Sequence, residues 1–240
     1  AVAVYDGTSW ALQITADTHE PPRDLYSVFG FAEDEVYAVG DGGIVLRYNG
    51  KKWLVDDVEG PYNTTADLRA AGGLPRADGT RLLVAAGLDS RALERGTETW
   101  VDRSVGLTND LLGVRVGEDG RVLAVGSRGL ALTYSDGRFG SLATNTLADL
   151  TAVSGPWVTG AGGTLLREDA GGLVPVSMPV VEDLADVWER NETAWSVGRT
   201  GGLYEATAAG VTERIGLPGV PLEAIAVAGG VEQRLWDLQV

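Results

Sequence analysis

Five aspartates recur at regular spacing, and their carboxylates are the groups best placed to do chemistry. Each opens the same phrase, in which an acid is followed by leucine, two variable residues and a small or β-branched apolar residue: Asp24, Asp67, Asp110, Asp149 and Asp183. A sixth copy, at Pro221, lacks the acid. Carboxylates gathered at one place attract cations and basic peptides. The alternative is that each aspartate accepts hydrogen bonds from amides of an adjacent glycine-rich turn and so closes its own repeat.

Two further residues depart from the regular pattern and are candidate binding residues. Asp186 takes a place that is small in every other copy of the phrase: Ser27, Ala70, Gly113, Ala152 and Ala224. Because a buried, unpaired carboxylate is costly, we expect Asp186 to face water or to pair with a group such as an arginine. Tyr62 lies in the variable segment 57–66, where an aromatic side chain could stack on a sugar or anchor a peptide. The alternative for that segment is a surface loop stiffened by proline.

Catalytic and metal-binding side chains are scarce. The chain has no cysteine and one histidine, His19, which stands in an acidic segment with Asp17 and Glu20. These counts exclude disulfides, thiol catalysis and cysteine metal sites, and a Ser-His-Asp set is not expected from one histidine in a variable segment. A solvated loop is the simpler interpretation of His19, since zinc and iron sites use more nitrogen or sulfur ligands. We therefore predict that the protein is not an enzyme and holds no cofactor or metal.

The charge balance excludes one class of partner. Thirty-four acidic residues against nineteen basic ones give a net charge of −15, which disfavours binding to a nucleic-acid backbone. No apolar run reaches the length of a membrane span. The sequence starts at Ala1 rather than Met, so we expect a processed or truncated product from which a signal peptide or lipid anchor has been removed.

The elements that must position the aspartates repeat with the phrase, whose copies are 34 to 43 residues apart. Between two copies the pattern predicts four short strands, A to D, at 25–31, 35–40, 43–48 and 52–56 in the first repeat. A glycine-rich turn, Gly40-Asp41-Gly42-Gly43, joins strands B and C, and Tyr48-Asn49-Gly50 leads into the turn between C and D. Four antiparallel strands per forty residues are typical of a β-propeller blade.

The two ends of the chain complete one another in this scheme. Residues 222–240 supply strands A and B of a last blade, and residues 1–14 supply its strands C and D. The sequence therefore predicts an all-β fold, a six-bladed β-propeller of four-stranded antiparallel blades in one domain, 1–240. The predicted blades are 25–58, 68–103, 111–143, 150–178, 184–216, and 222–240 plus 1–14. Such a closure removes two exposed sheet edges.

The turn motifs carry a resemblance to known families. Tyr5-Asp6-Gly7-Thr8-Ser9-Trp10 and Tyr48-Asn49-Gly50-Lys51-Lys52-Trp53 resemble a degenerate Asp-box, the C–D turn of sialidase-type propellers. The combination with Val39-Gly40-Asp41-Gly42-Gly43 is similar to the repeats of photosystem II stability-factor-like propellers, which are abundant in secreted and surface lipoproteins of myxobacteria. The resemblance implies an exported bacterial protein, at the cell surface, in the periplasm or outside the cell. Function does not follow from the fold.

These observations favour a non-catalytic binding or scaffold propeller that engages a protein partner through the face carrying the D–A and B–C loops. The first alternative is a glycan-binding, lectin-like propeller, which would repeat one pocket in most blades. The second is a sialidase-like glycoside hydrolase, which would need an arginine cluster, a tyrosine nucleophile and carboxylates for proton transfer. Arg69 and Arg115 hold different positions in their repeats, and no Tyr–Glu pair is evident from spacing. A cation in the central channel remains a further possibility for the aspartates.

Overall fold

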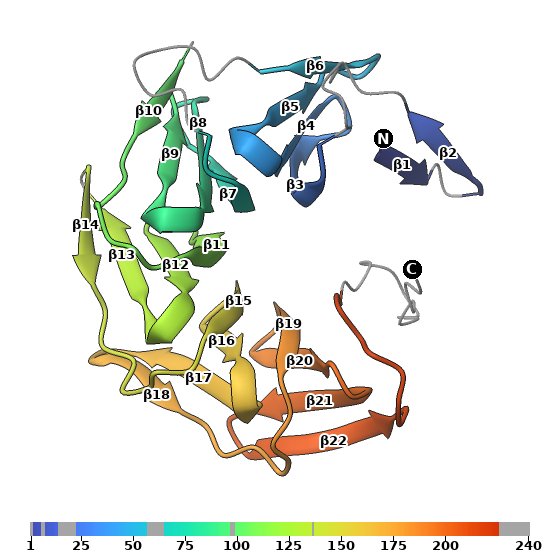
Figure 1. Cartoon of the computed structure of the whole chain (residues 1–240), viewed down its shortest axis with the longest axis vertical. Helices are drawn as coiled ribbons and strands as arrows, with labels where there is room; N and C mark the ends of the chain where they lie inside the picture. The colour runs from blue at the N-terminus through green and yellow to red at the C-terminus, as the bar shows by residue number, and fades with distance from the viewer. Residues whose placement is uncertain are drawn as a thin grey trace. The chain divides into compact units, whose positions relative to one another are not determined.

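The computed structural model describes residues 2–5, 8–13, 23–56, 65–96, 99–135 and 137–225. Within these residues the fold is all-β, with five four-stranded antiparallel sheets and one two-stranded piece near the N-terminus (Figure 1). The described part of the chain contains no α-helix, and its only helical turns are four short 3-10 turns. The residues that would carry the predicted strand B at 234–240, together with Tyr62 and His19, lie outside the described residues.

We number the five sheets as blades 1 to 5, each with four strands in chain order. Blade 1 holds β3 (Leu25–Ala32), β4 (Glu35–Gly40), β5 (Val45–Tyr48) and β6 (Trp53–Val55). Blade 2 holds β7 (Leu68–Pro75), β8 (Arg81–Gly87), β9 (Ala92–Arg95) and β10 (Trp100–Asp102). Blade 3 holds β11 (Leu111–Val116), β12 (Val122–Gly126), β13 (Ala131–Ser135) and β14 (Arg138–Ser141).

Blade 4 holds β15 (Leu150–Ser154), β16 (Trp157–Gly160), β17 (Thr164–Asp169) and β18 (Gly172–Pro175). Blade 5 holds β19 (Leu184–Arg190), β20 (Thr193–Gly198), β21 (Gly202–Thr207) and β22 (Gly210–Gly216). The N-terminal piece pairs β1 (Val2–Tyr5) with β2 (Trp10–Gln13). The strands that the sequence predicts in 25–58 are present, and β1 and β2 are the strands predicted there as C and D of a last blade.

Alternation of apolar residues builds the core between neighbouring blades. In β3 the side chains of Phe29 and Phe31 lie on one face, where they pack against Leu83 and Trp100 of blade 2. Leu123 of blade 3 packs in the same way against Leu150 and Val158 of blade 4. Because neighbouring sheets of the same unit bury a face against one another, their strands need β-branched or large apolar residues at alternate positions.

The chain divides into two compact units. The first comprises Ala1–Asp110 with Glu118–Gly120, and the second comprises Leu111–Gly117 with Arg121–Val240. Blades 1 and 2 belong to the first unit, and blades 4 and 5 to the second. The prediction of a single domain stays a prediction.

A tight turn connects strands B and C in blades 1 to 4. Each is a 3-10 turn that follows a glycine: η1 (Asp41–Gly43), η2 (Leu88–Ser90), η3 (Ser127–Gly129) and η4 (Ala161–Gly163). Its central residue is left-handed even where it is not glycine, with φ 54° at both Asp89 and Arg128. The glycine before η2 is required by close approach, because a Cβ on Gly87 would lie 1.9 Å from the carbonyl oxygen of Asp67. The turn at 87–90 has only one glycine, and it nevertheless has the backbone conformation of its glycine-rich equivalents.

Candidate functional site

The acid-leucine phrase forms a β-bulge at the start of strand A in all five blades. The register between strands A and B shifts between the leucine and the residue two positions later, for example between Leu25 and Ser27 and between Leu184 and Asp186. The same shift occurs in the other three blades. A bulge leaves one residue unpaired and redirects its side chain, and bulges are frequent beside functional sites. In blades 1 and 2 the bulged residues are Tyr26 and Arg69.

Four of the five predicted aspartates use their side chains to hold the B–C turn of the preceding blade. The Oδ1 atom of each accepts a hydrogen bond from the backbone N–H of the central turn residue, at 2.8 to 3.1 Å: Gly42 to Asp67, Asp89 to Asp110, Arg128 to Asp149 and Gly162 to Asp183. The hydrogen bond that the sequence predicts is present. The expectation that it closes the aspartate's own blade is wrong, because the acceptor comes from the next repeat.

The backbone of three of these aspartates also holds the turn of their own blade. The carbonyl oxygen of Asp67 accepts the N–H of Leu88 at 2.9 Å, and that of Asp183 accepts the N–H of Arg199 at 2.9 Å. Three aspartates therefore link two consecutive B–C turns, one through the side chain and one through the carbonyl: Asp67, Asp149 and Asp183. This geometry fixes the D–A loop that precedes strand A. A binding role for these carboxylates, including a shared collar, stays a prediction.

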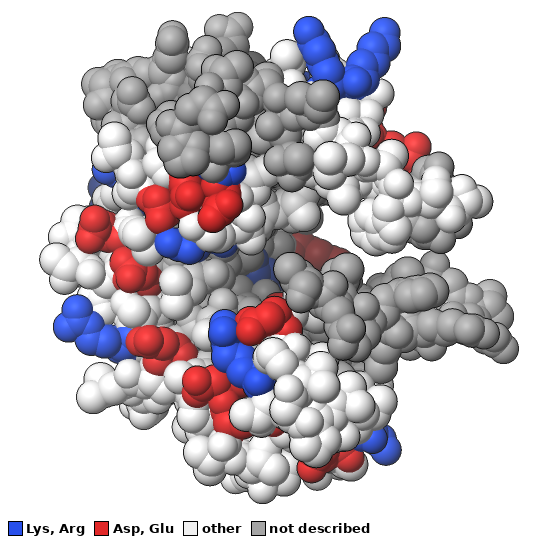
Figure 2. Space-filling model, turned by 45° about the vertical axis from the view of Figure 1, so that its right-hand side comes forward, with Lys and Arg blue, Asp and Glu red and all other residues white. Residues whose placement is uncertain are grey.

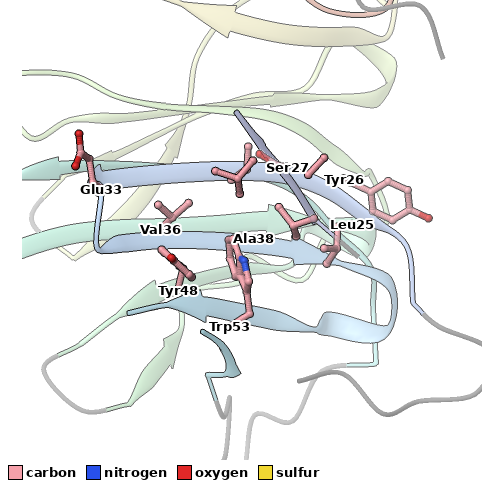
Figure 3. Close-up of a pocket in the computed structure, with 12 residues that line it drawn as sticks. Leu25, Tyr26, Ser27, Glu33, Val36, Ala38, Tyr48 and Trp53 are labelled. Carbon is pink, nitrogen blue, oxygen red and sulfur yellow. The ribbon is translucent and has the colours of Figure 1, made fainter. Parts of the chain in front are cut away.

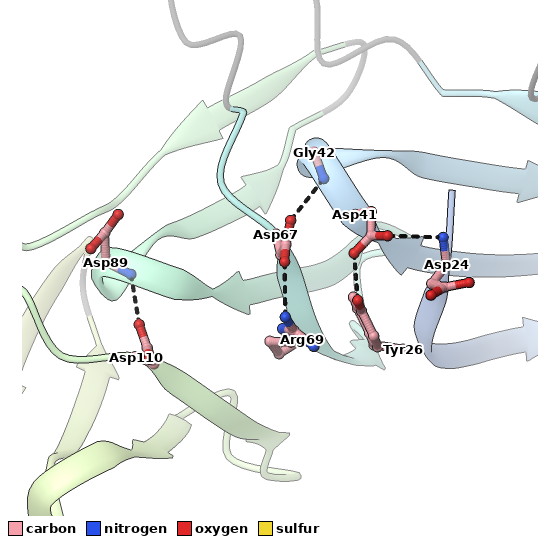
Figure 4. A network of polar contacts seen from close by, with 8 residues as sticks. All are labelled: Asp24, Tyr26, Asp41, Gly42, Asp67, Arg69, Asp89 and Asp110. Carbon is pink, nitrogen blue, oxygen red and sulfur yellow. Dashed lines mark hydrogen bonds and ion pairs between the residues drawn. The ribbon is translucent and has the colours of Figure 1, made fainter. Parts of the chain in front are cut away.

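Asp24 belongs to a polar network on the exposed end of blades 1 and 2 (Figure 4). Its backbone N–H donates to Oδ2 of Asp41 at 3.1 Å, and the Tyr26 hydroxyl donates to Oδ1 of the same carboxylate. These two hydrogen bonds, the one from Tyr26 first, hold the pKa of Asp41 below its ordinary value. The hydrogen bond to Asp41 in turn raises the pKa of Tyr26.

The two bulged residues stack on one another in this network. The Arg69 guanidinium carbon lies 3.8 Å from the centroid of the Tyr26 ring, and Nη2 of Arg69 is 2.8 Å from Oδ2 of Asp67. Cation–π contact and ion pair together hold an aromatic ring that remains 40% exposed. Sequence analysis places Arg69 near strand A, but it gives no sign that Tyr26 is its partner, because the contact joins different repeats.

Glu182 is a functional-looking carboxylate that sequence analysis missed. It precedes Asp183 and is buried, and its Oε2 accepts the N–H of Thr200 at 2.9 Å and the hydroxyl of Thr200 at 2.6 Å. The Tyr204 hydroxyl donates to Oε1. Thr200 is the central residue of the B–C turn in blade 5. In blades 1 to 4 the backbone N–H of the equivalent turn residue donates to the aspartate of the next repeat. The next repeat starts with Pro221, so Glu182 replaces the missing acid from within its own blade.

Asp186 accepts hydrogen bonds from two backbone amides. Its Oδ1 accepts the N–H of Val187 at 2.8 Å, and its Oδ2 accepts the N–H of Ile225 at 3.0 Å. Burial raises the pKa of Asp186, and these two hydrogen bonds oppose the shift only in part. The carboxylate therefore has partners, as expected for a buried charge, and they are backbone amides. Ser27 takes the same part in blade 1, where its Oγ accepts the N–H of Ala71 at 3.1 Å.

The loops that the aspartates fix carry two exposed aliphatic side chains. Leu147 is 85% exposed and Val181 is 87% exposed, and each stands two residues before the aspartate of its phrase. The following strands β15 and β19 pack on one another through Ala152 and Leu184, so both side chains lie on neighbouring loops at the same end of unit two. The loop before β15 is also held by the Thr144 hydroxyl, which donates to the carbonyl of Gly129 at 2.8 Å.

An apolar cavity of about 500 Å³ lies between the N-terminal piece and blade 1 (Figure 3). Val2 and Val4 of β1 line one side, and Val36, Ala38 and Trp53 line the other. The N-terminal piece is anchored there, since the Trp53 indole N–H donates to Oε1 of Gln13 at 2.7 Å. In blade 2 the equivalent sheet face, with Leu83, is covered by Phe31 of β3 and Tyr37 of β4.

Charges are mixed over the surface. Figure 2 shows acidic and basic side chains interspersed on the face in view, without a continuous basic patch. Among the described residues, no three histidine, cysteine or acidic side chains gather in a way that could hold a metal ion. That same part of the chain contains no helix with the length and hydrophobicity that a bilayer crossing requires.

Comparison with known proteins identifies the fold. No protein-family model matches the chain, and no curated protein matches its sequence. A structure of YCF48 bound to a D1 peptide is similar with a TM-score of 0.67 and 17% identity, over 92% of this chain and 76% of that one. YCF48 from Cyanidioschyzon merolae gives a TM-score of 0.53 and 15% identity, over 89% of this chain and 92% of that one.

The extracellular domain of a putative hybrid two-component system from B. thetaiotaomicron gives a TM-score of 0.68 and 15% identity. The match covers 93% of this chain and 33% of that one, so the chain spans about a third of its length. These likenesses define the fold as a β-propeller. The resemblance to photosystem II propellers holds at the level of structure, since YCF48 is a photosystem II assembly factor.

Proposed function

We propose that this chain is a non-catalytic β-propeller that binds a protein partner through the face of its D–A and B–C loops. The observation that carries the proposal is the exposure of Leu147 and Val181 on loops that the aspartates hold in place. Exposed aliphatic side chains on a rigid loop give a partner apolar area to bury at little cost in conformational entropy. In the first unit, by itself, the stacked pair of Tyr26 and Arg69 presents residue types that dominate protein interfaces.

The structural neighbours support this proposal. YCF48 has been seen with a D1 peptide bound, which makes peptide recognition a reasonable use for a propeller of this shape. The likeness to an extracellular domain supports the proposal that this protein is exported. Loops that differ between blades favour one protein partner over a lectin with repeated, equivalent pockets.

A hydrolytic role receives no support from two Tyr–Glu pairs among the described residues, Tyr37 with Glu35 and Tyr204 with Glu182. The Tyr37 hydroxyl donates to Oε1 of Glu35 at 3.2 Å, a contact that spacing in the sequence did not reveal. Tyr37 is buried, and burial raises the pKa of its hydroxyl. Burial and the hydrogen bond to Glu182 raise the pKa of Tyr204. A tyrosine nucleophile must be activated toward its phenolate, and both environments do the opposite. We therefore keep the proposal that the protein is not an enzyme.

A displayed peptide library tests the proposed face. Peptides selected on the wild-type protein are expected to bind the double variant L147D/V181D at least about tenfold more weakly, because each aspartate places a charge in the apolar contact. The control is V174D, on β18, where the valine is likewise exposed but lies away from these loops. Equal binding to wild type and double variant would overturn the proposal, and saturable binding on a glycan array would favour the lectin alternative.

A further inference from the structure

A polar cavity of about 700 Å³ lies between blades 1 and 2. It is lined by Glu35 at the start of β4 and by Arg76, Thr80 and Gly96 of the A–B and C–D turns of blade 2, so it opens at the end of the strands opposite the B–C turns. Its volume falls within the range of small-molecule sites. The cavity is separate from the face proposed above for a protein partner.

Four arginines line this cavity, and three of them are already neutralised. Arg81 forms an ion pair with Glu35, and Arg76 lies 4.0 Å from a carboxylate oxygen of Glu94. Arg95 forms a two-point contact with Asp56, at 2.9 and 3.3 Å, and that carboxylate also accepts the Trp100 indole N–H at 3.1 Å. The oxygens of Asp56 are therefore committed. The fourth arginine is Arg47.

Arg47 is held in place without a counter-charge. Its guanidinium carbon lies 5.9 Å from the centroid of the Tyr37 ring, which orients the planar group. Its Nε is buried and makes no hydrogen bond, and no carboxylate among the described residues forms an ion pair with it. A buried donor left unpaired carries a desolvation cost, and proteins seldom leave one without a reason.

We propose that this cavity binds a small molecule through a carboxylate or phosphate group, with Arg47 as the ligand-binding residue. A guanidinium presents two parallel N–H donors, which match two oxygens of such an oxyanion. In a protein whose net charge is −15, a fixed and unpaired cation within a polar cavity is a selective place for an anion. The proposal is independent of the protein-binding face.

Arg167 provides a matched control. In blade 4 it pairs across the strands with Trp157, as Arg47 pairs with Tyr37 in blade 1, and its guanidinium carbon lies 5.3 Å from the centroid of the indole ring. It does not line the cavity between blades 1 and 2. The variants R47Q and R167Q therefore remove the same charge from the same kind of aromatic contact.

The test follows the arginine Nε–H signals by NMR while sodium phosphate or sodium malonate replaces sodium chloride at constant ionic strength. We expect a saturable shift of the signal that is absent from R47Q, with the other arginine signals of the protein changing less. In calorimetry, affinity is expected to fall at least about tenfold in R47Q and to stay within about twofold in R167Q. R47K keeps the positive charge but lacks the two parallel N–H donors of the guanidinium, so it is expected to bind the anion with intermediate affinity.

The two probes separate the two sources of the oxyanion, since the tighter of them identifies phosphate or carboxylate as the preferred group. Thermal unfolding of R47Q checks that the variant is folded before its affinity is measured. Equal affinity of folded R47Q and wild type for both probes would overturn the proposal. So would a loss of affinity in R167Q as large as in R47Q, because it would indicate a general effect of charge.

Discussion

The pKa values of two carboxylates in blade 5, Glu182 and Asp186, are shifted in opposite directions by their surroundings. Glu182 and Asp186 both bind backbone amides across a junction between elements. Burial raises the pKa of both side chains, but at Glu182 the hydrogen bonds from Thr200, Tyr204 and Gly202 outweigh burial and lower it overall. At Asp186 burial prevails and the pKa is raised. The two groups therefore contribute to stability with opposite dependence on pH.

Replacing Glu182 by glutamine is expected to destabilise the protein by about 2 kcal/mol, because the amide cannot accept from all four donors. Since the pKa of Glu182 is lower in the folded state, its contribution is present above the ordinary value of 4.5 and is lost as pH falls through the folded value. Denaturant unfolding at several pH values measures both effects. The control E223Q removes an exposed ion pair with Arg199 and should cost less than about 0.5 kcal/mol. A similar cost for both variants would contradict the account of Glu182.

Replacing Asp186 by asparagine is expected to change the pH dependence in the opposite direction. A raised pKa means that the folded protein holds the proton more tightly, so wild-type stability declines as pH rises from the unfolded value through the folded one. The asparagine variant lacks this decline. Its stability relative to wild type should therefore increase as the pH rises above the ordinary pKa of aspartate and through the raised pKa of the folded state. A difference that is constant with pH would show that Asp186 is not a buried titrating group.

Sequence analysis identified the repeated aspartates and the odd position of Asp186, but not what they touch. The hydrogen bond from Gly42 to Asp67 joins residues 25 apart, and the one from Ile225 to Asp186 joins residues 39 apart. A repeat pattern shows which positions are equivalent, whereas partners across repeats depend on how the sheets pack. The role of Glu182 was not predicted, because it replaces the aspartate that is missing at Pro221. The replacement becomes apparent only from the hydrogen bonds that Thr200 donates to Glu182.

At the scale of the element, the aspartate before strand A joins consecutive blades by accepting a hydrogen bond from the B–C turn of the preceding blade. Replacing Asp149 by alanine leaves the N–H of Arg128 without its acceptor, and we expect a loss of about 1 kcal/mol in the free energy of unfolding. Replacing it by asparagine keeps an oxygen at the same place and should preserve most of that stability. Denaturant titration of the two variants separates loss of the hydrogen bond from loss of the charge. Equal destabilisation by asparagine and alanine would assign the effect to charge.

The glycine before the B–C turn lets the turn approach the carbonyl of the aspartate that precedes strand A. A Cβ at Gly87 would lie 1.9 Å from the carbonyl oxygen of Asp67, which is itself hydrogen-bonded to Leu88 and cannot yield without breaking the turn. We expect G87A to cost about 3 kcal/mol, at the upper end of overpacking effects. G140A, in β14, meets nothing nearer than the Thr133 hydroxyl at 3.9 Å and should cost less than about 1 kcal/mol. A thermal melt that shifts equally in both would contradict the close-approach argument.

Strands and turns were predictable from sequence because their signals are local. The alternation in Glu35–Gly40 and the glycines of 40–43 define one strand and its turn without reference to the rest of the chain. The β-bulge at the phrase was not predicted, since a single unpaired residue such as Tyr26 leaves no mark in the alternation of a short strand. That bulge decides where Tyr26 and Arg69 meet, so the most distinctive exposed pair of the candidate site could not be read from sequence.

At the scale of the whole molecule, the main prediction concerns the last blade. The two-stranded piece β1–β2 packs on blade 1 through Val2 and through the hydrogen bond between Gln13 and Trp53. Its assignment as strands C and D of a last blade stays a prediction. Strands A and B of that blade, predicted in residues 222–240, stay a prediction, because the structure describes only 222–225 of them. The described start of that segment is tied to blade 5, because Leu222 donates to the carbonyl of Gly198 and Ile225 donates to Asp186.

The central claim is the prediction that the two chain ends join in one blade, which would close the repeats into a ring. The chain has no cysteine, so spin labels on A3C and D237C can be attached without background. Neighbouring strands lie about 5 Å apart, so we expect pulsed electron resonance to give a narrow label separation on the order of 10 to 20 Å. A broad distribution centred beyond about 40 Å would show that the ends do not share a blade, because that separation is more than the radius of gyration of a folded domain of this length.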